Sequence, residues 1–138
     1  MTALRVLHVD DDADIREVVE ISLGLDPDLV TRSCGSGMEA LTLAMDWSPD
    51  LILLDVMMPA MDGPATLAHL RDDPGTRGIP VIFMTACMEI RELNIFRSHS
   101  DLGVIPKPFD PMTLAALVRG YVQPGDRGGR QSWVFRDQ

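Results

Sequence analysis

The stretch Leu51–Pro59, with the sequence LILLDVMMP, is an uninterrupted apolar run that ends on a single carboxylate and is then stopped by a proline. Such a run predicts a strand that is buried on both faces, because a strand with one face in water alternates apolar and polar residues. Asp55 then lies at the carboxyl end of the strand, where open α/β folds bind their ligands. Asp55 is therefore a candidate reactive group, although a strand-end aspartate also commonly caps the loop or helix that follows.

Length and composition limit the classes of protein to which the chain can belong. Its 138 residues have room for one domain with a sizeable core, and its net charge of −9 disfavours nonspecific binding to nucleic acid or to anionic membranes. No apolar run approaches the length that spans a membrane, and the N-terminus does not read as a signal peptide. Cys34 and Cys87 belong to no metal-binding spacing and are expected to be reduced thiols. We therefore expect a cytoplasmic protein.

The order of apolar segments along the chain predicts the fold. Strand-like segments lie at 5–9, 29–34, 51–59, 79–86 and 103–109, and helical spacing of apolar residues follows each of them. Five strands that alternate with five helices indicate a parallel sheet covered on both faces through right-handed crossovers. The predicted fold class is an α/β three-layer sandwich, with the last strand at a sheet edge because its internal proline cannot donate to a ladder.

Several side chains are predicted to pack in the core rather than to bind ligands. Met38, Leu41 and Met45 share one helical face, and the methionines are interpreted as core filler. His8 interrupts an apolar strand and is interpreted as a hydrogen-bonded core residue. The last helix is expected to bury one stripe, formed by Leu114, Leu117, Val118 and Tyr121.

The C-terminal residues differ in composition from the rest. We predict a domain over residues 1–122 and a tail over residues 123–138, which begins with a linker-like segment rich in proline and glycine. The tail is expected to be mobile. An alternative interpretation is that Trp133 and Phe135 anchor it on its own domain or on a partner, since large aromatic side chains make good anchors.

Polar residues end the predicted strands and should gather on one rim of the parallel sheet. They are Asp10, Asp11, Asp55, Thr85 and Lys107. Three neighbouring carboxylates repel by about 1 kcal/mol per pair in water and by about 4 kcal/mol at an effective dielectric constant of about 20, so they need a cation. Hard oxygen ligands without clustered histidine or cysteine favour Mg²⁺. A carboxylate beside Mg²⁺, with an ammonium and a hydroxyl to bind anionic oxygens, suits the formation of an aspartyl phosphate.

Four motifs in this order resemble the receiver domain of two-component response regulators, over residues 3 to 122. They are VDDD at 9–12, LDVMMP at 54–59 with MDG at 61–63, MTA at 84–86 and KPF at 107–109. Their combination is highly specific. The resemblance implies a flavodoxin-like fold, similar to that of the chemotaxis response regulator, with a five-stranded parallel sheet in the order 2-1-3-4-5.

The resemblance also implies roles for the residues of the rim. Asp55 is the expected phosphoacceptor, Asp11 a direct Mg²⁺ ligand, and Asp10 a residue that acts near the metal through water. Met57 is expected to offer its backbone carbonyl to Mg²⁺, so its apolar side chain is no objection.

Further roles concern the phosphoryl group and its donor. Thr85 and Lys107 are expected to contact the phosphoryl oxygens, and the peptide bond from Lys107 to Pro108 is expected to be cis. The donor would be a phosphohistidine on a sensor histidine kinase or a histidine phosphotransfer protein, with Ile15, Pro108 and Phe109 as parts of the docking surface. The downstream partner is an unidentified protein.

Three positions depart from the usual pattern of the family. Val104 stands where the family usually has an aromatic residue, and the stiff, small valine cannot act as a rotamer switch. We hypothesise that a shift of Thr85 and the loop after it carries the signal instead. Met57 and Cys87 stand at two positions that influence hydrolysis in the family, and neither is suited to hold an attacking water, which predicts a long-lived phosphoryl group.

The predicted function is a single-domain response regulator that catalyses its own phosphorylation and acts by binding a partner. One alternative is a phosphohydrolase of the haloacid-dehalogenase kind, because Asp10 and Asp12 form an Asp-x-Asp motif after an apolar strand. Another is a receiver-like binding module that is never phosphorylated. Direct nucleic-acid binding and membrane insertion are not expected.

Overall fold

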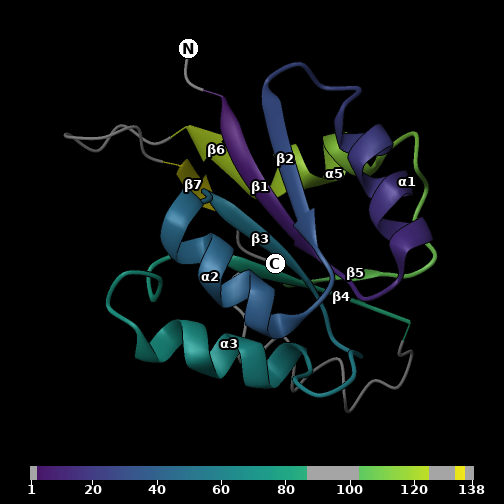
Figure 1. Ribbon diagram of the computed structural model, residues 1–138. Helices are drawn as coiled ribbons and strands as arrows, with labels where there is room; N and C mark the ends of the chain where they lie inside the picture. Colours follow the sequence, from purple (N-terminus) through teal and green to yellow (C-terminus); the bar gives the residue numbers. More distant parts are fainter. Residues whose placement is uncertain (1–2, 87–102, 125–132, 136–138) are drawn as a thin grey trace.

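A computed structural model describes residues 3–86, 103–124 and 133–135 of the chain (Figure 1). The helix that the sequence predicts around 90–96, and with it Cys87, lies outside these residues.

The centre of the molecule is a five-stranded parallel sheet. Its strands are β1 (Leu4–Val9), β2 (Leu29–Cys34), β3 (Leu51–Asp55), β4 (Val81–Thr85) and β5 (Gly103–Pro106), in the order β2-β1-β3-β4-β5. This order confirms the predicted topology. It also places the proline-containing strand β5 at an edge, as expected for a strand that lacks one ladder donor.

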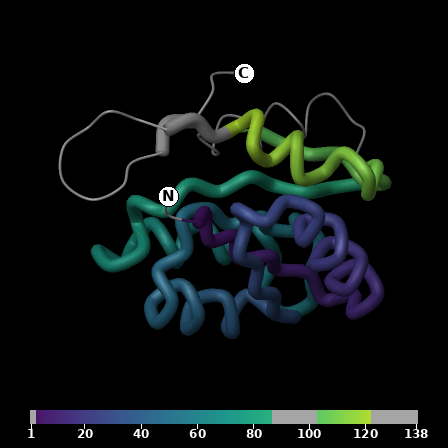
Figure 2. The backbone as a smooth tube through the Cα atoms, turned by 90° about the horizontal axis from the view of Figure 1, so that it is seen from above, coloured from purple at the N-terminus to yellow at the C-terminus, as the bar shows by residue number. Residues whose placement is uncertain are grey.

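Helices cover both faces of the sheet and complete the three predicted layers. The described helices are α1 (Ala13–Leu23), α2 (Gly37–Trp47), α3 (Gly63–Asp72) and α5 (Leu114–Tyr121). One core cluster joins α1 and α5 to the sheet and the other joins α2 and α3 to it, and α2 and α5 are seen on opposite sides in Figure 2. None of the described helices is long and apolar enough to cross a lipid bilayer.

Strand β3 is buried along its whole length, as its unbroken apolar sequence predicts. Successive side chains point to opposite faces of a strand. Leu51 and Leu53 therefore pack in the core under α1 and α5, whereas Ile52 and Leu54 pack in the core under α2 and α3. Burial on both faces holds the strand in register and delivers Asp55 to its carboxyl end.

Polar caps fix where the helices begin. Asp12 accepts hydrogen bonds from the backbone N–H groups of Asp14 and Ile15 at the start of α1, at 2.9 and 3.3 Å. Asp62 accepts one from Ala65 at the start of α3, at 2.9 Å. Such caps satisfy N–H groups that a helix leaves without a partner in its first turn. The caps also end the loops that carry the acidic residues of the rim.

The face that α2 buries differs from the predicted one. Met38 and Met45 are 63% and 51% exposed, so the interpretation of these methionines as core filler is wrong. The buried face consists of Gly37, Ala40 and Ala44. The physical reason is close packing: small residues let the helix backbone approach the sheet and α3, and the long methionines are left on the flanks.

The last helix departs from its predicted stripe at one position. Leu117 is 42% exposed, whereas Leu114, Val118 and Tyr121 are buried as expected. The three buried residues are spaced by four and three, which keeps them on one face of a helix, and Leu117 lies beside that face.

The chain after α5 forms a second, two-stranded sheet. Strand β6 (Val122–Pro124) pairs in antiparallel fashion with β7 (Trp133–Phe135). The described residues of the predicted tail, 123–124 and 133–135, are thus hydrogen-bonded to each other through their backbones. This pairing was not expected from the sequence, which predicted a mobile tail. The boundary between residues 122 and 123 stays a prediction.

The close approach of α2 and α3 can be tested with alanine. A Cβ atom at Gly37 would lie 2.3 Å from Thr66 Oγ1 and 2.9 Å from Met61 Sδ, whereas one at Gly78 would meet nothing within 4 Å. We expect Gly37→Ala to lower the free energy of unfolding by about 1–3 kcal/mol, because overpacking forces neighbours to move. Gly78→Ala is the matched control and should change it by less than about 0.5 kcal/mol. Urea unfolding followed by circular dichroism measures both.

Candidate functional site

Three carboxylates meet at the carboxyl-terminal rim of the sheet. Asp10 and Asp11 follow β1, and Asp55 ends the neighbouring strand β3. One oxygen atom from each of the three lies within 4.8 Å of the others. Asp10 and Asp55 are buried, and Asp11 is exposed. The adjacency of β1 and β3 in the sheet therefore brings together residues that are far apart in the sequence.

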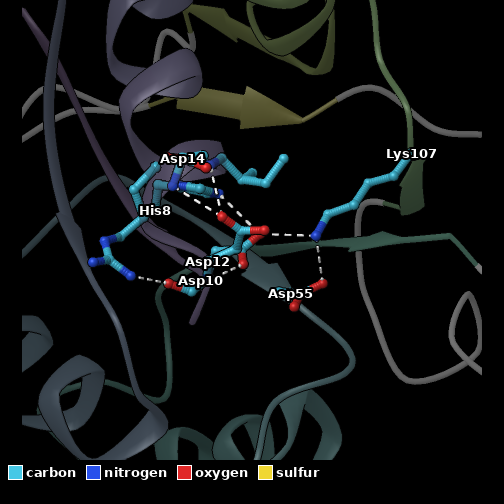
Figure 3. Close-up of polar contacts among 8 residues, drawn as sticks. His8, Asp10, Asp12, Asp14, Asp55 and Lys107 are labelled. Carbon is cyan, nitrogen blue, oxygen red and sulfur yellow. Dashed lines mark hydrogen bonds and ion pairs between the residues drawn. The ribbon is translucent and has the colours of Figure 1, made fainter.

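The side chain of Lys107 reaches into this cluster from the end of the edge strand. Its Nζ atom donates to Asp10 Oδ2 at 2.8 Å and to Asp55 Oδ1 at 2.9 Å (Figure 3). Its backbone N–H donates to the carbonyl of Thr85 at 2.8 Å, and its peptide bond to Pro108 is cis, as expected. Lys107 is thus held at β4 by its backbone while its ammonium bridges two of the acids.

Burial and charge set the ionisation of these groups. Burial raises the pKa of Asp55, and repulsion from Asp10 and Asp11 adds to the rise, while the hydrogen bond and charge of Lys107 partly offset it. Burial alone would lower the pKa of Lys107, but its bonds to the two carboxylates outweigh that effect and raise the pKa. The lysine is therefore an ammonium ion at neutral pH, and it serves as the counter-charge of the cluster.

The cluster fits a hard divalent cation. Its ligand atoms are carboxylate oxygens, which Mg²⁺ prefers, and their mutual distances allow one ion to be bound by several of them. Asp11 opens the cluster to solvent, so the ion could keep part of its water shell. Both oxygens of Asp10 have donors. Oδ2 accepts from Lys107, and Oδ1 accepts from the backbone N–H of Asp12 at 2.9 Å, which fixes the orientation of the carboxylate. Asp12 itself caps α1 and points its side chain to the helix instead.

Arg16 supports the turn that carries the acids. Its Nη1 atom donates to the backbone carbonyl of Asp10 at 2.7 Å. A Cβ atom at Gly35 would lie 3.0 Å from the same nitrogen, so the absence of a side chain there leaves room for the guanidinium. Arg16 was not predicted as a site residue, because nothing in a helical pattern indicates a bond from its side chain to a carbonyl six residues earlier.

The structure explains why a glycine, Gly63, follows Asp62 in the motif after Asp55. Its backbone N–H donates to the carbonyl of Val56 at 2.9 Å, and a Cβ atom there would lie 2.6 Å from the carbonyl oxygen of Asp55. The start of α3 therefore packs directly against the backbone of Asp55. Only glycine allows this approach without displacing the strand end.

The other predicted site residues differ in their burial. Thr85 is fully buried at the end of β4, and its carbonyl binds Lys107. Met57 is 74% exposed two residues after Asp55. Phe109 and Ile15 are half-buried, and Pro108 is exposed. The structure thus brings Asp10, Asp11, Asp55 and Lys107 into direct proximity, whereas the predicted contacts of Thr85 and Met57 with a ligand remain predictions.

His8 lies two residues before Asp10 on β1 and is fully buried. Neither of its ring nitrogens has a hydrogen-bond partner among the residues that the structure describes, and Nε2 is 4.0 Å from Asp10 Oδ2. The expectation of a core histidine is confirmed, but the expectation that it is hydrogen-bonded is wrong. Burial lowers its pKa to about 4, so the imidazole is neutral at neutral pH.

Fold and site together define an α/β protein with an acidic cluster, suited to a metal ion, at the carboxyl ends of its strands. The response regulator receiver domain is the family whose model matches the chain, over residues 6–119. The chain therefore belongs to the receiver domain family of response regulators.

Curated relatives and solved structures agree with this assignment. The chain is 36% identical over 124 residues to the DNA-binding dual master transcriptional regulator RpaA of Synechocystis, a match that covers 89% of this chain and 51% of RpaA. It is also 36% identical over 125 residues to the DNA-binding response regulator MtrA of Mycobacterium leprae, covering 88% of this chain and 52% of MtrA. The chain thus spans about half the length of these relatives.

Among solved structures, the chemotaxis protein CheY4 of Vibrio cholerae has a TM-score of 0.76 at 28% identity, covering 86% of this chain and 98% of CheY4. The receiver domain of the Francisella response regulator 1452 has a TM-score of 0.75 at 28% identity, covering 84% of this chain and 93% of that one. The match extends over nearly the whole of both structures, so the similarity concerns the complete receiver fold.

The repulsion within the cluster predicts how Asp55 affects stability. A carboxylate whose pKa is raised by folding destabilises the folded state when it is ionised, and the penalty grows as the pH rises from the unfolded value through the folded one. Without divalent cations at pH 7, Asp55→Asn should therefore raise the free energy of unfolding, by on the order of 1 kcal/mol. The gain should shrink near pH 4. Urea unfolding at the two pH values measures it.

The exposed Asp46 on α2 offers a control. The free energy of unfolding of Asp46→Asn should change between the two pH values by as much as that of the wild type. A loss of stability in Asp55→Asn at pH 7 would contradict the prediction, because it would mean that the bond from Lys107 outweighs burial and repulsion.

Proposed function

We propose that Asp55 accepts a phosphoryl group from a phosphohistidine and that the phosphorylated chain acts by binding a partner protein. The observation that carries the proposal is the convergence of three carboxylates and one ammonium at the rim, with ligand atoms within 4.8 Å and Lys107 bonded to two of the acids. Family membership makes this the chemistry to expect of such a site.

In the proposed reaction, an oxygen of the Asp55 carboxylate attacks the phosphorus atom of the donor. A P–O bond forms and the P–N bond to the imidazole breaks, with the electron pair of that bond leaving on the nitrogen, which takes up a proton. Asp55 must be ionised to attack, and the ammonium of Lys107 favours that form against the effect of burial. After transfer, Lys107 and the hydroxyl of Thr85 would bind phosphoryl oxygens.

Mg²⁺ would be held by Asp10, Asp11 and Asp55 together with the backbone carbonyl of Met57. When bound, the ion neutralises charge on the phosphoryl oxygens and the acids. The chain's own residues then do the positioning. Asp12 and Arg16 hold the turn that carries Asp10, through the hydrogen bonds described above.

The proposed donor is a sensor histidine kinase or a histidine phosphotransfer protein in the cytoplasm. The half-buried Ile15 and Phe109 and the exposed Pro108 are proposed parts of its docking surface. RpaA and MtrA are named as DNA-binding proteins, but the match covers about half of each. For this chain, whose net charge is −9, we propose a protein partner rather than direct contact with nucleic acid.

One of the two alternative functions is disfavoured and the other is still to be tested. Family membership selects the receiver interpretation over a haloacid-dehalogenase phosphohydrolase, and Asp12 of the Asp-x-Asp motif is engaged as a helix cap. A receiver-like module that is never phosphorylated shares the family and the fold, so experiment must separate it from the proposed phosphoacceptor.

Intact mass after incubation with acetyl phosphate tests the proposal. In the presence of Mg²⁺ we expect a single phosphoryl adduct, because the ion offsets the charge that accumulates in the cluster. The adduct should be absent without Mg²⁺ and in Asp55→Asn. Asp46→Asn, an exposed aspartate on α2, is the control and should be modified like the wild type.

The absence of an adduct under every condition would favour the phosphorylation-independent module. Consumption of acetyl phosphate without an adduct on Asp55 would indicate a hydrolase.

The lifetime of the phosphoryl group should depend on Met57. Its side chain is 74% exposed beside the phosphoacceptor and has no group that can orient water strongly. Met57→Asn should therefore shorten the lifetime several-fold, since an amide can hydrogen-bond an attacking water. Decay of the adduct followed by intact mass measures this. Met45→Asn, at a methionine that is 51% exposed on α2, should leave the decay rate unchanged. An equal or longer lifetime in Met57→Asn would contradict the prediction.

A further inference from the structure

His8 is placed directly beneath the acidic cluster. It precedes Asp10 by two residues on β1, so the two side chains project from the same face of the strand. In the register of the sheet His8 lies beside Ser33 of β2 and Leu53 of β3, and Leu53 in turn precedes Asp55 by two residues. The imidazole therefore occupies the first layer of the core below both buried acids.

The surroundings of this imidazole are those of an apolar core residue. Val6 and Leu53, on the same face of the sheet, belong to the core cluster under α1 and α5. His8 is fully buried, and both of its nitrogens lack hydrogen-bond partners among the described residues. A polar group left in this condition destabilises a fold, and a leucine of similar size would pack there without an unsatisfied atom. The resting structure alone gives no reason for a histidine at this position.

A charged atom close to the imidazole suggests a reason. His8 Nε2 is 4.0 Å from Asp10 Oδ2, which is too long for a hydrogen bond. That oxygen is bonded to Lys107 Nζ at 2.8 Å. A divalent cation among the acids would repel the ammonium, and an anionic group on Asp55 would attract it, so Asp10 Oδ2 would lose its donor. A carboxylate oxygen has lone pairs for more than one partner, so Asp10 Oδ2 can face the ion and still accept a hydrogen bond, and the His8 imidazole lies next to it.

We propose that His8 is a positioning residue for metal binding, which donates a hydrogen bond from Nε2 to Asp10 when a divalent cation draws Lys107 away. The neutral imidazole carries one N–H group, which is sufficient for this bond. Partners of this kind orient metal-binding side chains in many proteins, and their removal weakens metal affinity about 10- to 100-fold. The inference rests on the proposed function, because it assumes that the acids bind Mg²⁺.

Three variants separate hydrogen bonding from packing. In His8→Gln the amide nitrogen is as many bonds from the backbone as Nε2 of histidine and retains a donor. His8→Leu retains a similar volume without a donor. Asp11→Asn removes one carboxylate of the metal cluster and reports whether that cluster is the site of binding.

Calorimetric titration with MgCl₂ at pH 7 measures the affinity of each protein. We expect His8→Leu to bind Mg²⁺ about tenfold more weakly than the wild type, and His8→Gln to stay within about threefold of it. In the absence of Mg²⁺, His8→Leu should melt at a temperature several degrees higher than the wild type, because it removes an unsatisfied group from the core. A folded and more stable variant with a weaker metal site is an outcome that a purely structural role does not produce.

A second readout observes the hydrogen bond itself. In ¹⁵N-labelled wild-type protein, MgCl₂ should move the ring N–H proton resonance of His8 downfield, and the resonance should be missing in His8→Leu. Equal Mg²⁺ affinity in the wild type and His8→Leu, or equal weakening in His8→Gln and His8→Leu, would overturn the role of His8 while leaving the proposed function intact. A wild type that binds no Mg²⁺, or an Asp11→Asn variant that binds it unchanged, would overturn both.

Discussion

The repulsion between carboxylates on one rim of the sheet is the constraint on which the site depends. Asp10 and Asp55 are buried beside each other, Asp11 lies close by, and the ammonium of Lys107 bridges the two buried acids. Burial and repulsion raise the pKa of Asp55 in spite of that bridge. The structure is therefore under electrostatic tension at the point where a phosphoryl group and a cation are expected to act, and relief of that tension can be coupled to binding.

The rest of the fold keeps these charges together against their repulsion. Strand β3 is buried on both faces, so Asp55 cannot move outward without exposing apolar side chains. The close packing of Gly63 against the backbone of Asp55 and the bond from Arg16 to the carbonyl of Asp10 hold the loops on either side. Lys107 is attached to β4 through its backbone. A rigid scaffold of this kind is what a positioned phosphoryl-transfer site requires.

Most of the fold could be predicted from the sequence because its signals are local and consistent. The apolar run before Asp55 indicated a doubly buried strand, and the alternation of strands with helices indicated a parallel sheet, whose polar strand ends must share a rim. Side-chain exposure was harder to predict. Met38 and Met45 have the right spacing for a core face, but α2 packs through Gly37, Ala40 and Ala44, since contact distance between backbones decides which face of a helix is buried.

Apolar runs and periodicity in the sequence are enough to predict the order of strands and helices along the chain and the residues that end each strand. Those residues include the acids, the threonine and the lysine at the rim. The bonds among these residues depend on the folded structure: Lys107 bridges Asp10 and Asp55, and His8 is buried 4.0 Å from Asp10 without a hydrogen-bond partner among the described residues. The physical reason is that periodicity specifies which elements form and which faces they bury, whereas hydrogen bonds and charge interactions depend on distances of a few ångströms between residues that are distant in sequence.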